Sequence, residues 1–448
     1  MSLKILLNNI MTKKMECLGL VLVLLLAAVL RIQAISSTVI DLPVRLDAQQ
    51  YYFGSLNLAR WGIFSNAAPA AIPPSPNSFI PPLLSVLILP FLKYPPTDSM
   101  LFQFNTFQAC MGIITVALVF LLFRLFTSSW ISLGAALASA VSPHLVCLST
   151  YLLTETSFTL LLVGSLVCIG YALKRDSLCM SLLGGLVLGV SALARPTTEY
   201  FPVFMLLGMW LFVDRKQFIK TVLPSAILAL SVIFAWKIRN FFAIGVFSDP
   251  TLAFKTIQHG MYPGMMYNNI QSSFATPYRF DPLADQMTNL HNVLAVMWQR
   301  VQADPGIYLY WYCIGKPMAF LQWGFQDGAG EIFVYPAIYS PYFDVPLFGY
   351  TYFFMKAVHI PLIVFAFIGG GLAVFRPDYL RMSRKESLPL LLIVGVIVYF
   401  LLLHIVGFPL ARYSLPIRPC LYGLGVFTIV TAVRQLWAFG KCRLSKAS

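Results

Sequence analysis

The 448-residue sequence predicts an all-α polytopic membrane protein, with about ten transmembrane helices and further amphipathic helices on its outer face. Hydrophobic residues make up 58% of the chain and charged residues only 11%, with a mean hydropathy of +0.77. Apolar runs of about twenty residues recur along the chain, and each is long enough to cross a bilayer as a helix. The basic residues, finally, are concentrated in short segments between these runs. The three observations together exclude a water-soluble domain.

The apolar runs define the expected helices. The first run follows Lys13 and Lys14 and superficially resembles a signal peptide. No clear small-residue cleavage site follows it and further spans do, so we interpret it as a retained signal-anchor. The ten expected helices are Leu18–Ala34, Met100–Phe123, Trp130–Val146, Thr154–Ala172, Leu178–Ala194, Tyr200–Val213, Thr221–Trp236, Thr351–Phe375, Leu388–Val406 and Pro419–Trp437.

The distribution of charge predicts the orientation of the chain. With the N-terminus inside, the short inner segments hold 17 of the 31 lysines and arginines but only 5 of the 17 acidic residues. This bias is the positive-inside signature, and it accounts for the net charge of +14 without a nucleic-acid partner. Both termini are therefore expected in the cytoplasm, with a multi-pass chain in a membrane, most simply a bacterial inner membrane.

Two outer segments are too long to be simple connectors, and they divide the chain. Residues 1–240 form a transmembrane core that includes a first outer loop at about 35–99. Residues 241–350 form a large outer loop with interfacial helices, and residues 351–448 supply the C-terminal transmembrane helices. In the first outer loop, prolines interrupt the apolar segment Phe79–Phe91, which is too short to span about 30 Å of hydrocarbon.

Two acidic residues are the candidates for chemistry. Asp47 lies shortly after the first span, and Glu155 lies at the outer mouth of the helix expected at 154–172. Both fall on the same face of the membrane, and an ionisable residue at the edge of an apolar run is a functional candidate. The alternative is structural: each is an exposed loop charge, or Glu155 a carboxylate favoured by the dipole of a helix that Thr154 caps.

Basic and aromatic residues on the same face are candidates for substrate binding. Arg45 flanks Asp47, and Tyr52 follows it in the same segment. Arg195, Lys316 and Arg412 lie at outer helix ends or in the aromatic part of the second loop, where the positive-inside bias disfavours cations. Arginine and lysine bind phosphate by charge-assisted hydrogen bonds, while the alternative is snorkelling to lipid headgroups.

Other kinds of site receive no support from the sequence. The eight cysteines form no CxxC pair and the five histidines no HExxH or HxH pattern, so no metal site is predicted from spacing. There is no P-loop, dinucleotide-binding glycine motif or nucleophile elbow. The residue patterns therefore identify no cofactor.

Several short motifs occur in an order that resembles a known family. They are Arg-Leu-Asp-Ala-Gln-Gln-Tyr-Tyr at 45–52, the proline-led apolar segment after it, Leu-Thr-Glu-Thr at 153–156, Leu-Ala-Arg-Pro at 193–196 and Ala-Arg-Tyr-Ser-Leu-Pro at 411–416. This arrangement resembles the polytopic GT-C glycosyltransferases, particularly the branch with the lipid A aminoarabinose transferase and the protein O-mannosyltransferases. The likeness covers most of the chain and is weakest at about 240–304.

The resemblance implies a membrane enzyme that takes a sugar from a polyprenyl-phosphate donor on the non-cytoplasmic side. Its first-loop carboxylate matches Asp47, as general base, and its second acid matches Glu155. Arg45, Tyr52, Arg195, Lys316 and Arg412 would bind the donor, and the acceptor would be a glycan, a lipid or a protein. Many relatives carry a second acid directly after the first, where this chain has Ala48. A divalent cation is a possible cofactor in such a site.

One displacement with a single base predicts inversion at the anomeric carbon, because a lipid phosphate leaves without help from a second acid. Two other functions stay open at this stage. A polytopic transporter or flippase of a lipid-linked substrate would place charges near the middle of broken helices. An inactive relative that serves as an assembly partner would also fit the missing second acid.

Overall fold

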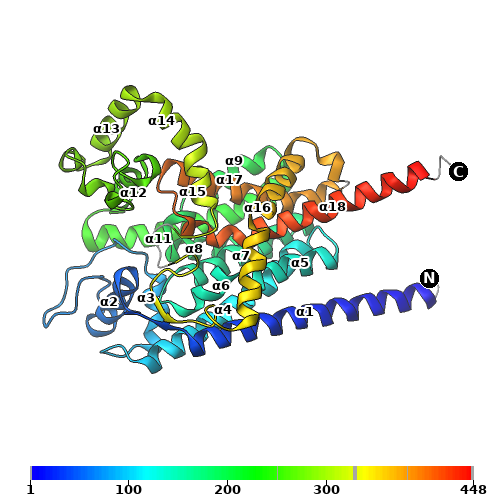
Figure 1. Ribbon diagram of the computed structural model, residues 1–448, viewed down its shortest axis with the longest axis horizontal. Helices are drawn as coiled ribbons and strands as arrows, with labels where there is room; N and C mark the ends of the chain where they lie inside the picture. Colours follow the sequence, from blue (N-terminus) through cyan, green and yellow to red (C-terminus); the bar gives the residue numbers. More distant parts are fainter. Residues whose placement is uncertain (1–2, 250, 326–329, 381, 445–448) are drawn as a thin grey trace.

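The chain forms a bundle of long helices with a smaller set of short elements gathered at one end (Figure 1). The computed structural model describes residues 3–249, 251–325, 330–380 and 382–444. Each of the ten expected apolar runs forms helix, which confirms the predicted fold class. The bundle helices are α1 (Leu3–Ser37), α4 (Asp98–Arg124), α5 (Ser129–Ala140), α6 (Pro143–Cys147), α7 (Glu155–Arg175), α8 (Leu178–Ala194), α9 (Phe201–Trp210), α11 (Leu223–Ile244), α16 (Pro346–Phe375), α17 (Arg384–Val406) and α18 (Arg418–Leu444).

Not every bundle helix is long enough to cross a membrane by itself. Among the described residues, seven helices are long and apolar enough to span, and an eighth span results if the bent pair of α5 with the segment 143–150 counts as one. The two parts of that pair meet at 56°. The apolar helix α8 is shorter, at 17 residues, and α9 has ten. The expected number of about ten is therefore approximate, and the chain is an integral membrane protein.

The outer elements are short and lie between the long helices in sequence. The helical ones are α2 (Leu46–Trp61), α3 (Leu83–Ile88), η1 (Leu89–Phe91), α12 (Thr251–Gly260), η5 (Pro263–Met265), η6 (Gln271–Ser273), η7 (Pro277–Arg279), η8 (Ala284–Gln286), α13 (Leu290–Ala303), α14 (Pro305–Tyr310), η9 (Trp311–Gly315) and α15 (Lys316–Leu321). Connecting turns are η2 (Leu148–Thr150), η3 (Pro196–Thr198), α10 (Arg215–Gln217), η4 (Phe218–Val222), η10 (Pro377–Leu380) and η11 (Ala411–Ile417).

A small antiparallel sheet joins the two outer segments. Strand β1 (Val39–Ile40) directly follows α1, and it pairs with β2 (Ala337–Tyr339) from the second segment. The pairing places Val39 opposite Tyr339 and Ile40 opposite Ala337. Two-residue and three-residue strands carry no periodic signal, so the sequence did not predict this sheet.

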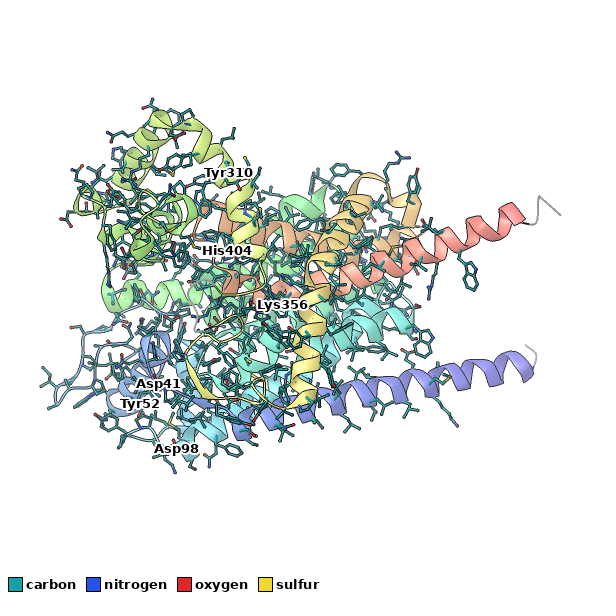
Figure 2. All side chains as sticks on the ribbon, in the orientation of Figure 1. Asp41, Tyr52, Asp98, Tyr310, Lys356 and His404 are labelled. Atoms are coloured by element: carbon teal, nitrogen blue, oxygen red, sulfur yellow. The ribbon has the colours of Figure 1, made fainter. Side chains whose placement is uncertain are left out.

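The two ends of the chain lie at the same end of the bundle. Figure 1 shows α1 and α18 both projecting toward the end opposite α2, α3 and α13. Asp41, Tyr52 and Asp98 gather near the outer elements in Figure 2, far from the free ends of α1 and α18. This arrangement agrees with an even number of crossings.

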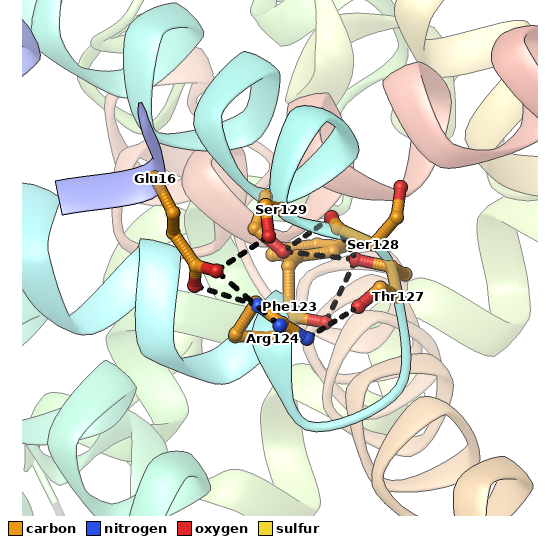
Figure 3. Close-up of polar contacts among 7 residues, drawn as sticks. Glu16, Phe123, Arg124, Thr127, Ser128 and Ser129 are labelled. Atoms are coloured by element: carbon orange, nitrogen blue, oxygen red, sulfur yellow. Dashed lines mark hydrogen bonds and ion pairs between the residues drawn. The ribbon is translucent and has the colours of Figure 1, made fainter. Parts of the chain in front are cut away.

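A polar cluster fixes α1 to the turn between α4 and α5 at the opposite end from the outer elements (Figure 3). The Glu16 carboxylate accepts hydrogen bonds from Arg124 Nε at 2.8 Å and from the Ser129 hydroxyl at 2.6 Å. Arg124 also donates to the Thr127 carbonyl at 3.1 Å. These contacts explain why one of the few acids of the inner segments is present: it holds two helices together.

Close packing of α8 sets the position of the residue that follows it. A Cβ atom on Gly185 would lie 2.3 Å from the Ser225 carbonyl oxygen, and one on Gly189 would lie 2.9 Å from the Ala229 carbonyl oxygen. Only glycine permits this approach of α8 to α11, as small residues do where membrane helices meet. The end of α8, and with it Arg195, is therefore fixed against the bundle.

The orientation makes a labelling prediction. In a cysteine-free background, we expect Ser75→Cys in the first outer loop to react with a membrane-impermeant maleimide from the non-cytoplasmic side, because Ser75 is exposed and the charge bias predicts that this loop lies on that side. Lys216→Cys, exposed in the turn between α9 and α11, should react only after the membrane is permeabilised. Equal labelling of both positions in sealed cells would contradict the orientation.

Candidate active site

Four segments far apart in sequence bring charged side chains together at the outer end of the bundle. Asp47 lies in the first turn of α2, and Glu155 is the first residue of α7. Arg195 ends α8, where the following Pro196 favours the extended conformation that it adopts (φ −147°, ψ 132°). Arg412 is the second residue of η11, the short helix that directly precedes α18.

The Arg412 guanidinium bridges the two candidate acids. Its Nε donates to Glu155 Oε1 at 2.5 Å, and its Nη2 donates to Asp47 Oδ2 at 3.1 Å. Arg195 Nη1 lies 2.8 Å from the same Glu155 oxygen. The four residues therefore form one network of two carboxylates and two guanidiniums, with no net charge.

The two acids differ sharply in exposure. The Glu155 side chain is 0% exposed, whereas the Asp47 side chain is 49% exposed. A buried carboxylate is tolerated only when it is paired, and Glu155 is paired with both guanidiniums. Its place at the first turn of α7 adds the favourable helix dipole. Glu155 therefore holds the two arginines in place, and Asp47 is the more accessible of the two acids.

Tyr51, rather than Tyr52, lies in the electrostatic field of this network. The Tyr52 hydroxyl donates to the Lys93 carbonyl at 2.5 Å, so it braces the first outer loop. Burial first, and then the charge of Asp47, raise the pKa of Tyr51, which stays protonated at neutral pH. Helical periodicity could have found Tyr51, because it lies four residues after Asp47 and shares its face of α2.

Arg45 stands beside the network rather than within it. Its guanidinium pairs with Asp41 at 3.9 Å and lies 5.5 Å from the centre of the Tyr335 ring. The Tyr335 hydroxyl in turn accepts a hydrogen bond from the Ala48 amide at 3.4 Å. Tyr335 comes from the second outer segment and thereby covers the start of α2, a contact that no local sequence pattern predicts.

Lys316 is buried near the outer end of α17, and its ammonium is not among the groups that contact the acids. Its Nζ donates to the backbone carbonyls of Ile405 at 2.7 Å, Gly407 at 2.9 Å and Val406 at 3.4 Å. An ammonium has three N–H groups, so these carbonyls occupy all its donors. Burial lowers the pKa of Lys316 to about 7.

The donor set does not suit a divalent cation. Within the described residues, no group of three or more His, Cys, Asp and Glu side chains is placed to hold a metal ion. Both carboxylates of the site already bind the Arg412 guanidinium, which supplies the positive charge that a metal ion would otherwise bring. Ala48 contributes no second carboxylate next to Asp47.

Comparison with known proteins places this geometry in a known fold. Residues 96–238 match the family model of the dolichyl-phosphate-mannose-protein mannosyltransferases. Across 97% of this chain, the structure is similar to the archaeal oligosaccharyltransferase AglB from Archaeoglobus fulgidus, in complex with an inhibitory peptide and a dolichol-phosphate, with a TM-score of 0.53 and 14% identity. The chain has the GT-C fold.

This chain is shorter than the GT-C protein that it matches. It spans 52% of the length of AglB, both in that complex and in the apo form, which matches with the same TM-score and identity over 96% of this chain. A weaker likeness, with a TM-score of 0.41, 12% identity and coverage of 92% of this chain and 77% of the other, links it to ArnT from Cupriavidus metallidurans bound to undecaprenyl phosphate. No curated protein matches the chain.

The difference in exposure between the two acids predicts different effects on stability. Glu155→Gln should destabilise the protein strongly, because losing one partner of a buried ionic group costs about 3 to 5 kcal/mol. Asp47→Asn should change the thermal unfolding temperature little, since half of its side chain is exposed. Thermal unfolding of the purified protein in detergent measures both variants, and equal destabilisation would contradict the assigned roles.

Proposed function

We propose that this chain is a glycosyltransferase that moves a sugar from a polyprenyl-phosphate donor to an acceptor hydroxyl on the non-cytoplasmic face of the membrane. The observation that carries the proposal is the half-exposed Asp47 carboxylate, held by Arg412 at the outer end of an apolar bundle. The GT-C fold supports it, as does the dolichol-phosphate in the complex of AglB.

In the proposed reaction, Asp47 is the general base. Its carboxylate takes the proton of the acceptor hydroxyl while that oxygen attacks the anomeric carbon of the sugar. The bond between the anomeric carbon and the phosphate oxygen breaks, and the polyprenyl phosphate leaves with the bonding electrons. A single displacement of this kind inverts the configuration at the anomeric carbon.

The arginines serve two purposes in this scheme. Arg412 donates a hydrogen bond to Asp47 Oδ2 and so orients the carboxylate, which leaves Oδ1 for the acceptor. Arg195, at 15% side-chain exposure, stabilises the charge that develops on the departing phosphate, with Arg412 beside it. The proposal therefore assigns Arg195 and Arg412 to the donor, and places Lys316 outside the phosphate site.

A groove between α9 and α11 suits the prenyl chain of the donor. This cavity measures about 500 Å³, and apolar side chains such as Val203, Ile227 and Phe234 line it. Lys237 and Glu199, which form an ion pair, also line the groove. The same two residues line a smaller neighbouring cavity together with Pro196, the residue after Arg195. A chain in the groove would thus lead its phosphate toward the arginines.

Loss of the base should abolish transfer without loss of fold. Asp47→Asn removes the proton acceptor but keeps the shape and one hydrogen bond to Arg412. We expect purified Asp47→Asn, reconstituted in liposomes with a panel of polyprenyl-phosphate sugars and candidate acceptors, to consume no donor. Asp41→Asn, an exposed acid of the same outer loop, is the matched control and should retain turnover. A fully active Asp47→Asn protein would contradict the proposal.

The two neighbouring tyrosines can be distinguished in the same assay. Tyr51→Phe should lower kcat, because the buried phenol lies in the electrostatic field of Asp47 and the other charges of the network. Tyr52→Phe should act through stability, since its hydroxyl binds only the Lys93 carbonyl among the described contacts. Comparison of kcat with the thermal unfolding temperature separates the two effects. A loss of kcat confined to Tyr52→Phe would show that the wrong tyrosine has been assigned.

A further inference from the structure

The C-terminal end of α17 is capped by a side chain from the second outer segment. Carbonyl groups in the last turn of a helix have no partner within the helix, and other groups must satisfy them. Lys316, on α15, donates to three of these carbonyls, at Ile405, Val406 and Gly407. A cation at a helix C-terminus also matches the dipole there.

A second contact fixes the same place. The Trp311 indole donates from Nε1 to the Gly260 carbonyl at 3.0 Å. Gly260 itself lies so close to the end of α17 that a Cβ atom on it would stand 2.0 Å from the Gly407 carbonyl oxygen. Gly260 of α12 and Lys316 of α15 therefore both meet Gly407, and the π-helical turn η9, which directly precedes Lys316, holds Gly260 through Trp311.

The segment that these contacts hold carries the bridging arginine. Only four residues separate Gly407 from Arg412. Phe408 and Leu410 pack in one buried cluster with Trp311, so the intervening backbone is held along its length. At the far end, Arg412 reaches Glu155 and Asp47.

We infer that Lys316 is a positioning residue, which clamps the end of α17 so that the Arg412 guanidinium is aligned on Asp47 and Glu155. The second outer segment thereby controls the geometry of a site to which its described residues contribute no ion pair. The structural part of this inference stands on the contacts above, and its catalytic consequence rests on the proposed function.

The clamp itself can be tested without any substrate. Lys316→Met keeps the length and the apolar stem of the side chain but removes all three donors. Hydrogen exchange of the amides of residues 405–413 should then accelerate in the purified full-length protein, while exchange in residues 330–337 stays unchanged. Lys356→Met, which removes an exposed lysine from its ion pair with Glu331, is the matched control and should leave 405–413 unaffected. Unchanged exchange of 405–413 in Lys316→Met would overturn the clamp.

The consequence for Arg412 needs a test that a general loss of stability would not pass. In the reconstituted assay, Lys316→Met should lower kcat by up to roughly 100-fold with little change in KM, because a displacement of about 1 Å in a catalytic group costs that much. Lys316→Arg, which keeps the donors, should restore part of the rate.

A double-mutant cycle with Arg412→Lys then separates positioning from folding. If Lys316 acts through Arg412, then Lys316→Met should cost much less in the Arg412→Lys background than in the wild type, since coupled residues are non-additive. Additive losses would overturn the positioning role. If the wild-type protein consumes no donor, the proposed function fails, but the exchange experiment still decides whether the clamp exists.

Discussion

The outer end of this protein depends on one side chain, the Arg412 guanidinium. It joins the start of α2 to the start of α7, and these helices carry the two acids of the site. Without Arg412, the buried Glu155 carboxylate would be paired with Arg195 alone, and Asp47 would lose its ion pair at the start of α2. Burial of Glu155 is costly, so the ionic network fixes the arrangement strongly: few other placements of these helix ends would leave the carboxylate paired.

Buried cations elsewhere in the chain follow a different rule. Arg31, near the C-terminal end of α1, donates to the carbonyls of Ala27 and Ala140, and Arg418 donates to the carbonyls of Gln322 and Trp323. Lys316 uses backbone carbonyls in the same way. Carbonyl dipoles satisfy a cation without adding an acid, which suits a chain with few acidic residues. Arg31 thereby joins α1 to α5, and Arg418 and Lys316 join bundle helices to the second outer segment, whereas Arg195 and Arg412 pair with Glu155 in the candidate site. Among the buried cations of the described residues, Arg412 thus differs from Arg31, Lys316 and Arg418 in being paired with acids.

Periodicity and charge counts predicted the bundle well, because apolar runs and short basic loops are local properties of the sequence. The runs behind α4, α7 and α17 reappear as helices with boundaries shifted by a few residues. Asp47 was also singled out from its place in the first outer loop, and Glu155, Arg195 and Arg412 from their positions at outer helix ends. Their pairing was not predictable, since Glu155 and Arg412 are separated by 257 residues and meet only through packing.

Other features lay beyond local patterns for identifiable reasons. The β1–β2 pair is too short to show alternation, and Tyr335 reaches α2 from the second outer segment. The positive charge of Lys316 predicted a phosphate ligand. Its three carbonyl partners, however, result from the packing of α15 against the end of α17, which no local pattern shows. Tyr51 was the exception, because counting four residues from Asp47 along the helix would have found it.

The central claim is that Asp47 faces the reacting atoms while Arg195 and Arg412 face the phosphate. A structure of the protein with a polyprenyl-phosphonate sugar, which cannot transfer its sugar, tests it most directly. We predict that the phosphonate contacts Arg195 and that the anomeric carbon lies beside Asp47. An acceptor oxygen should then have room at about 3 to 3.5 Å from that carbon. A phosphonate bound away from both arginines, with its sugar remote from Asp47, would contradict it.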